Sequence, residues 1–353
     1  MDLASLSRFR PLLERELSAS YGRVRRSAPR DVLPYLDLNR EFTLRGGKRF
    51  RATLVLGGYF LATGKDPRPV LPAAAAVEHF QSWMLIHDDI IDHADERRGG
   101  PTIHRALAQA HRRDRWGGSS EDYGVGIGIT LGDLEEPLTV DAFLSVRVSP
   151  AARLAALEEY ARMTRWTAFG QLLDIRTGAL DPGTVREEDV LAVHRYKSAV
   201  YTVVSPLKIG ALLGGKRSES LEDLEKFGTN IGIAFQLRDD VLGAGFDAEE
   251  SGKSSNDLVE GKRTLLVVQA WSKGSEADRS RLARVLGNAQ ATPEDIERAR
   301  NVIRETGSLD YSERRIEELT RAALRCVDRS RSIPARGKPL LKEVADRLVR
   351  RTS

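Results

Sequence analysis

The chain has 353 residues, of which 55 are Lys or Arg and 51 are Asp or Glu, so its formal net charge is +4. Hydrophobic residues make up 41% and charged residues 30%, a balance that excludes a disordered chain. The single cysteine, Cys326, excludes an internal disulfide framework and favours a cytoplasmic location. The charge balance is too even for a strongly basic surface, so no nucleic-acid partner is expected.

Helical patterns begin at the start of the chain. Residues 1–17 (MDLASLSRFRPLLEREL) predict one charged amphipathic helix rather than a signal peptide. The longest stretch without a charged residue, 52–64, is shorter than the about 20 apolar residues of a membrane span, so no stable membrane insertion is expected. Strand signals are scarce, and short Pro- or Gly-rich points separate segments of helical length. The pattern predicts an all-α bundle that forms a single domain over residues 1–353.

A basic cluster, GGKRFR, occupies residues 46–51. Glycine permits close approach of the backbone to a ligand, and the three cations that follow offer an anion site. Each basic cluster of the chain, taken alone, is also compatible with ordinary solvated surface.

An acidic cluster follows in the segment IHDDIID. Asp88, Asp89 and Asp92 fall within one turn, after the apolar run FQSWMLI at 80–86. Acids at the end of a buried helix are costly unless they are paired or bind metal, and oxygen ligands favour Mg²⁺. The alternative is a solvated acidic helix end. His87 is expected to pack or to support the site rather than to bind metal.

A second acidic pair, Asp239 and Asp240, ends another apolar run, and Gln236 lies one turn before it. Basic residues recur beside both pairs: Arg97 and Arg98 after the first, Lys253 and Lys262 after the second, with Lys197 between them. Two acidic pairs with cations nearby predict carboxylates on opposite walls of one cavity, where Mg²⁺ ions hold a diphosphate.

Five ordered motifs carry a resemblance to a known family. GGKRFR, DDIID with RRGGPTIHR, GQLLDI, YKSAVYTVVSPLKIGALLGG and FQLRDDVLG with GKSSNDLVEGKRT resemble trans-isoprenyl diphosphate (polyprenyl) synthases, short-chain farnesyl or geranylgeranyl type. The resemblance implies an isoprenoid-synthase helical bundle around a deep cavity, usually as a homodimer. It also implies condensation of isopentenyl diphosphate with an allylic diphosphate to all-trans C15–C20 products.

The resemblance implies roles residue by residue. Asp88, Asp92 and Asp239 would bind three Mg²⁺ ions, and Asp89 and Asp240 would support them. Contacts to the allylic diphosphate would come from Arg97, Lys197, Ser198, Gln236, Lys253 and Lys262. Contacts to isopentenyl diphosphate would come from Lys48, Arg51, Gln81 and Arg98.

Three positions depart from the family pattern. Gln81 stands where many members carry His, Ser198 replaces Thr, and Gly243 takes the place of a third Asp, with Asp247 following. Large residues also precede the first acidic motif: Trp83 and Met84 lie about 6–7.5 Å back along the helix from Asp88. They predict a cavity floor that keeps products short, and the alternative is that they are plain core.

Three other functions compete with this interpretation. A class I terpene cyclase also uses an aspartate-rich motif, but Glu260 stands where its second metal motif, here beginning at Asn256-Asp257, requires Ser. A non-catalytic subunit of a heteromeric prenyl synthase tends to lose the acidic pairs that this chain keeps. A phosphohydrolase built on His87-Asp88 would need further His ligands.

Overall fold

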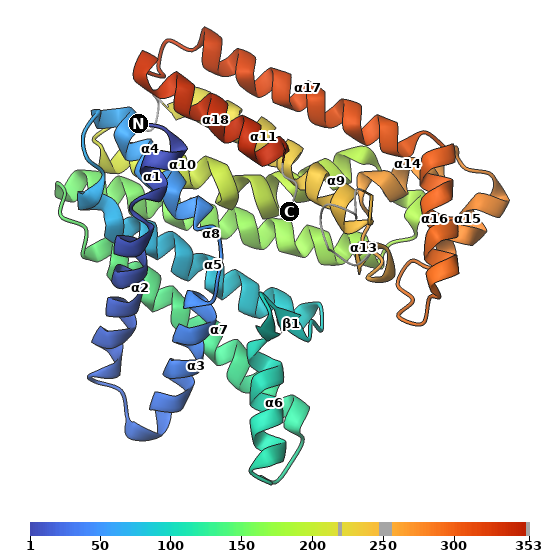
Figure 1. The fold of residues 1–353 in the computed structure, drawn as a ribbon, viewed down its shortest axis with the longest axis horizontal. Coiled ribbons are helices and arrows are strands. Elements are labelled where there is room, and N and C mark those ends of the chain that lie inside the picture. Colours follow the sequence, from blue (N-terminus) through green and yellow to red (C-terminus); the bar gives the residue numbers. More distant parts are fainter. Residues whose placement is uncertain (218–220, 247–255, 351–353) are drawn as a thin grey trace. The chain divides into compact units, whose positions relative to one another are not determined.

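The computed structural model describes residues 1–217, 221–246 and 256–350, and nearly all of its regular structure is helical (Figure 1). The predicted all-α fold is confirmed. The chain divides into two compact units: unit 1 comprises Met1–Glu158 and Pro206–Lys216, and unit 2 comprises Glu159–Ser205 and Arg217–Ser353. That residues 1–353 act as a single domain stays a prediction.

Unit 1 contains the N-terminal helices and a two-residue hairpin. Its elements are α1 (Leu3–Ser7), α2 (Arg10–Arg25), η1 (Arg30–Val32), α3 (Leu33–Leu44), α4 (Phe50–Thr63), η2 (Arg68–Val70), α5 (Leu71–Ile91), β1 (Glu96–Arg97), β2 (Gly100–Pro101), α6 (Ile103–Arg113) and α7 (Ser120–Leu144), with the start of α8 (Pro150–Ala179) and most of α10 (Ser205–Leu213).

The N-terminal segment differs from its prediction. The single helix expected over residues 1–17 is two helices, because α1 ends at Ser7 and α2 begins at Arg10. Pro11 lies in the first turn of α2, where backbone N–H groups make no hydrogen bond within the helix, so the lack of an N–H in proline costs nothing there. Proline inside a longer helix would break a backbone hydrogen bond, so the chain restarts there.

Helix α5 is the centre of unit 1. It packs along α7 and also against α2 and α4, and Figure 1 shows these helices side by side. Its run Ala73–Ala76 is fully buried, which lets neighbouring helices approach closely. Towards its C-terminal end, Ile86 joins a core cluster with Phe42, Ile103, Leu107 and Leu131. The end of α5 that carries the first acidic motif is therefore held firmly.

Unit 2 is also helical in its described part. Besides most of α8, its elements are η3 (Pro182–Thr184), α9 (Glu187–Val193), the π-helix η4 (His194–Val204), α11 (Glu222–Gly243), α13 (Asn256–Val259), α14 (Leu265–Lys273), α15 (Glu276–Ala283), α16 (Pro293–Glu305), α17 (Ser308–Arg329), η6 (Ala335–Gly337) and α18 (Lys338–Val349). Helix α11 packs against η4 and α17.

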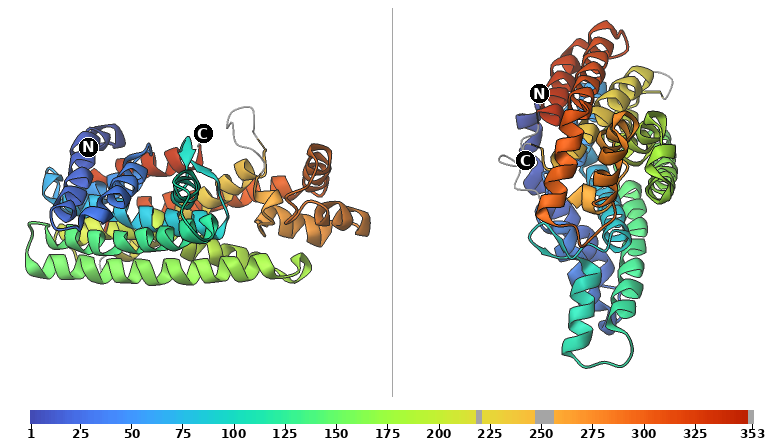
Figure 2. Two further views of the ribbon diagram at one scale, coloured as in Figure 1. Left: turned by 90° about the horizontal axis from the view of Figure 1, so that it is seen from below. Right: turned by 90° about the vertical axis from the view of Figure 1, so that its right-hand side faces the viewer.

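The two longest helices are α7 and α8, and Figure 2 shows both along their length. Among the described residues, no helix combines the length and the apolar character that a membrane crossing requires.

Candidate active site

The first acidic motif ends α5. Asp88 and Asp89 lie in the last turn, and Asp92 is the C-cap residue, whose N–H donates to the Asp88 carbonyl at 2.8 Å. Asp89 is only 1% exposed, whereas Asp88 is partly buried and Asp92 is exposed. Three neighbouring aspartates thus occupy three different environments.

Asp89 is paired with Arg97. The Arg97 Nε donates to Asp89 Oδ1 at 2.6 Å, while Asp89 Oδ2 is buried and makes no hydrogen bond. Burial raises the pKa of Asp89 to about 6 although Arg97 opposes this shift, and the charges of Asp88 and Asp92 raise it further. A further cation near Asp89 would therefore stabilise its ionised form.

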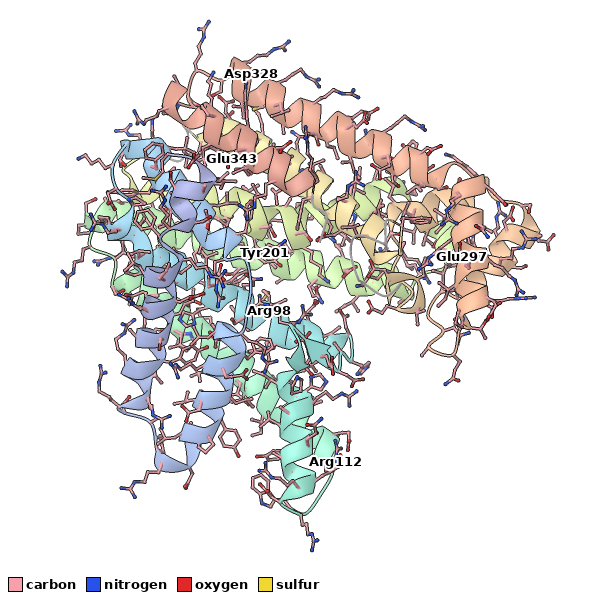
Figure 3. All side chains as sticks on the ribbon, in the orientation of Figure 1. Arg98, Arg112, Tyr201, Glu297, Asp328 and Glu343 are labelled. Atoms are coloured by element: carbon pink, nitrogen blue, oxygen red, sulfur yellow. The ribbon has the colours of Figure 1, made fainter. Side chains whose placement is uncertain are left out.

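The hairpin β1–β2 delivers two arginines to unit 1. Arg97 pairs with Gly100 across the antiparallel ladder, and the connecting residues Arg98 and Gly99 have φ of 53° and 72°. Positive φ at both positions is the requirement of a type I′ turn. Arg98 Nη1 donates to the Arg45 carbonyl at 3.0 Å, which directs Arg98 to the GGKRFR segment (Arg98 is labelled in Figure 3).

The GGKRFR segment enters α4 through a left-handed turn. Lys48 is exposed before the helix, and Arg51 lies half-buried in its first turn. Gly47 has a φ of 90°, a conformation that residues with a side chain rarely adopt, and the guanidinium carbon of Arg98 lies 3.3 Å from where its Cβ would be. Dense surroundings lower the pKa of Arg98, and nearby Arg49 acts in the same direction. Because these cations lie close together and repel one another, an anion that binds between them would be stabilised.

Further predicted residues lie on α5. Gln81, Trp83 and Met84 are all partly buried. The indole of Trp83 meets Phe80 edge to face at 5.9 Å between centroids, and its Nε1 is buried without a hydrogen bond. His87 Nε2 lies 3.3 Å from the Ile129 carbonyl and 3.4 Å from Asp133 Oδ1, both on α7.

The second acidic motif ends α11. Asp240 is 5% exposed, whereas Asp239 is partly exposed. Gln236 Nε2 donates to Asp240 Oδ1 at 3.3 Å, and His194 Nε2 lies 2.9 Å from Asp240 Oδ2. The second aspartate of this pair is therefore enclosed by neighbours, as in the first motif.

Lys197 and Ser198 lie on the π-helix η4, a rare geometry that is frequent at functional sites. Lys197 Nζ donates to Asp174 Oδ2 on α8 at 2.5 Å. A Cβ on Gly170 would overlap the backbone of Lys197, so glycine in GQLLDI is what allows α8 to approach η4.

Gly243 stands where the family pattern has a third aspartate, and Asp257 of α13 fills the space beside it. A Cβ on Gly243 would overlap the carboxylate of Asp257, which Lys262 Nζ approaches to 3.0 Å. Burial raises the pKa of Asp257, Lys262 opposes this, and Asp240 adds to it. Burial acts to lower the pKa of Lys262, but Asp257 and Glu260 raise it overall.

The structure groups the predicted residues within each unit. In unit 1 it joins Asp89 to Arg97 and directs Arg98 to Gly47; in unit 2 it joins Gln236 to Asp240. That the two acidic motifs face one cavity stays a prediction. Lys253 and Asp247 lie outside the described residues.

Three site neighbours were missed by the sequence reasoning, Glu78, Asp174 and His194, and a fourth, Asp257, was considered only as part of a cyclase metal motif. Asp174 and Asp257 each lie inside a quoted motif, GQLLDI or GKSSNDLVEGKRT, so the motifs held a usable signal. Glu78 and His194 lie in no comparable pattern.

The donor set fits Mg²⁺. Carboxylate oxygens are its preferred protein ligands, and it is usually held by one or two carboxylates together with substrate phosphates. In the part of the chain that the structure describes, no three His, Cys, Asp or Glu side chains converge as a metal-binding group. The buried Oδ2 of Asp89 is a polar atom whose ionisation a bound cation would favour.

Comparison with known proteins identifies the family. The polyprenyl synthetase family model matches residues 35–303. Geranylgeranyl diphosphate synthase of Methanosarcina mazei is 34% identical over 308 residues, covering 87% of this chain and 86% of that protein. Geranylfarnesyl diphosphate synthase of Aeropyrum pernix is 30% identical, covering 87% and 91%.

Solved structures agree. Geranylgeranyl pyrophosphate synthase from Corynebacterium glutamicum, complexed with isoprenyl diphosphate and magnesium, is 33% identical and superposes with a TM-score of 0.90 over 99% of this chain and 100% of that one. The chain therefore belongs to the polyprenyl synthetase family of trans-prenyltransferases, as its motifs predict.

Proposed function

We propose that this chain condenses isopentenyl diphosphate with an allylic diphosphate to an all-trans C15–C20 prenyl diphosphate, releasing diphosphate. The family acts on this pair of substrates, and similar proteins are named for C20 and C25 products. The observation that carries the proposal is the presence of a cation near each acidic motif. In unit 1, Arg97 pairs with Asp89. In unit 2, Lys262 pairs with Asp257, whose carboxylate lies against Gly243 at the end of the helix that carries Asp239 and Asp240. A site that binds a diphosphate together with Mg²⁺ needs both acids that bind the metal and cations that bind the phosphate groups.

We assign Asp88, Asp92 and Asp239 to three Mg²⁺ ions, and Asp89 and Asp240 to supporting positions. When bound, Mg²⁺ supplies electrostatic stabilisation of the negative charge on the leaving diphosphate. The burial of Asp89 and Asp240 supports this division, because each is held by neighbours rather than open to a substrate.

The cations and polar groups divide between the substrates. The allylic diphosphate is assigned to Arg97, Lys197, Ser198, Gln236, Lys253 and Lys262, and isopentenyl diphosphate to Lys48, Arg51, Gln81 and Arg98. In the reaction the allylic C–O bond breaks with its electron pair on the diphosphate, where the cationic side chains stabilise the developing charge. The double bond of isopentenyl diphosphate then attacks the allylic cation, and the released diphosphate takes the proton that is lost.

Trp83 and Met84 are assigned to the floor that limits product length. Both are large, partly buried and on α5, shortly before Asp88. The unsatisfied indole N–H of Trp83 shows that its ring is held by packing rather than by a hydrogen bond.

We also propose a cytoplasmic homodimer. Helix α8 exposes Phe169, Leu172 and Ile175, at 45%, 66% and 50%, and their spacing of three places them on one side of the helix. A large apolar helix face is typical of a surface that a partner covers. Light scattering after size exclusion is expected to give twice the chain mass, and Leu172→Glu is expected to give monomer.

One assay separates the proposed function from its competitors. Purified protein is incubated with Mg²⁺, isopentenyl diphosphate and a C5, C10 or C15 allylic diphosphate, and products are identified by mass spectrometry. Elongated diphosphates support the synthase, and Asp88→Ala is expected to abolish them. A cyclic hydrocarbon indicates a cyclase, and free phosphate without elongation indicates a phosphohydrolase. No product with any primer refutes the proposal.

A further inference from the structure

Arg49 differs from the other cations of the GGKRFR segment. It is 4% exposed, whereas Lys48 is exposed and Arg51 is half-buried. Its Nη1 donates to Glu78 Oε2 at 3.0 Å, and its Nη2 donates to the carbonyls of Thr43 at 2.8 Å and Leu44 at 3.2 Å. The side chain thus folds back into the protein and ties the end of α3 to α5.

Glu78 makes a second connection. It is 2% exposed, and its Oε1 accepts the N–H of Ala52 in the first turn of α4 at 3.3 Å. A carboxylate at a helix N-terminus is favourable because the first N–H groups carry partial positive charge. Glu78 therefore fixes both the side chain of Arg49 and the helix that Arg49 introduces.

Arg49 also holds an uncommon backbone conformation. It is the N-cap residue of α4 with φ of 50° and ψ of 35°, a left-handed geometry that a residue with a side chain seldom adopts. Its own carbonyl accepts from the N–H and the Oγ1 of Thr53 at 3.0 and 2.9 Å. Such a conformation persists only where surrounding contacts determine it, as the bonds to Glu78 and Thr53 do here.

The same carboxylate offsets the charge of the cluster. The pKa of Arg98 is lowered by its dense surroundings and by Arg49, Arg97 and Arg51, and Glu78 opposes that effect. Glu78 thus reduces the repulsion among these cations when no anion is present. The pair has both a geometric and an electrostatic connection to the residues assigned to isopentenyl diphosphate.

We propose that Arg49 and Glu78 are positioning residues for isopentenyl diphosphate. Their ion pair sets the backbone of residues 46–51 and hence the positions of Lys48 and Arg51, without touching the substrate. This inference rests on the proposed function. The competing explanation is that the pair stabilises the fold and has no specific link to this substrate.

The test uses the double variant Arg49→Met/Glu78→Gln, which removes both charges and leaves neither buried alone. Calorimetry measures the binding of isopentenyl diphosphate, and steady-state kinetics measures the KM for the allylic substrate. The Kd for isopentenyl diphosphate is expected to rise about tenfold or more, with the allylic KM changing less than about twofold. Lys48→Ala is expected to weaken binding about tenfold in the natural chain but less than about threefold in the double variant.

A control breaks an ion pair in unit 2 whose carboxylate is buried. Glu159→Gln removes one carboxylate partner of Arg162, 2.7 Å away, and is expected to lower the melting temperature without changing the Kd for isopentenyl diphosphate. Should the double variant not fold, Arg49→Lys keeps a charge beside Glu78 but loses the carbonyl contacts, and an intermediate rise in Kd is expected.

Three results would overturn the proposal: a Kd like that of the natural chain in a folded variant, an equal weakening of both substrates, or an undiminished effect of Lys48→Ala. Failure of the proposed function is a separate outcome. The natural chain would then make no prenyl diphosphate, while calorimetry with isopentenyl diphosphate would still report on the ion pair.

Discussion

Asp89→Asn should stabilise the metal-free protein, and by an amount that depends on pH. Burial raises the pKa of Asp89 from 3.8 to about 6, so the folded state holds this proton more tightly than the unfolded state. The contribution of Asp89 to stability is therefore greatest below pH 4, falls as the pH rises from 4 to 6, and then stays low. The difference of about 2 pKa units corresponds to about 3 kcal/mol.

Asparagine is neutral at every pH, and its Oδ1 still accepts from Arg97. The variant is expected to gain about 3 kcal/mol over the natural chain at pH 8, about 1.5 kcal/mol at pH 5 and about 0.5 kcal/mol at pH 4. Urea unfolding in the presence of EDTA, followed by tryptophan fluorescence, measures these differences. Turnover with Mg²⁺ is expected to fall, because the carboxylate that we propose as support for the metal site is lost.

The control for this prediction is Asp95→Asn. Asp95 pairs with Arg105 at 2.7 Å but is 78% exposed. Loss of this ion pair is therefore expected to change the free energy of unfolding by less than about 1 kcal/mol at both pH 5 and pH 8. A stability gain of Asp89→Asn that is the same at pH 5 and pH 8 would refute the reasoning, as would a variant less stable than the natural chain at pH 8.

Three further changes test other parts of the structure. Gly243→Ala should lower the unfolding free energy by about 1–3 kcal/mol, since its Cβ would overlap Asp257; unchanged urea midpoints would contradict this. Tyr21→Phe should lower it by about 1–3 kcal/mol, because the buried Glu135 loses a donor, and a neutral effect would argue against that hydrogen bond. Trp83→Ala should shift products beyond C20 by mass spectrometry, and an unaltered distribution would remove Trp83 from the floor.

The sequence was sufficient for the helical fold and for the ends of α5 and α11, because apolar periodicity and an acidic end are local patterns. It could not predict that Arg49 is buried while Lys48 is exposed, because the two cations are adjacent in one motif and only the fold brings a buried carboxylate to Arg49. That carboxylate, Glu78, lies 29 residues further along the chain. The break before Pro11 was predictable in principle, as proline marks a helix start.

Other contacts between residues far apart in the sequence also depend on how the helices pack. Lys197 meets Asp174 23 residues away only because α8 packs closely on η4, and a π-helix shifts the register that ordinary helical spacing would give. The contact between Asp257 and Gly243 similarly depends on tertiary packing. The absence of a third acid at 243 is visible in the sequence, but the carboxylate that occupies the space is not.

The two acidic pairs share one arrangement, and its cause is helical geometry. Asp89 and Asp240 are 1% and 5% exposed, and each lies three residues after a buried apolar side chain, Ile86 or Leu237. Successive residues of a helix point about 100° apart, so when the second aspartate continues the buried face, the first must turn away from it. The buried aspartate is then held by a neighbour, Arg97 at Asp89 and Gln236 at Asp240, while the aspartate before it lies on a more exposed side of the helix. Under the proposed function the buried aspartate supports the site and the more exposed one binds the metal. Exchanging their environments would bury the acid that we propose as the metal ligand.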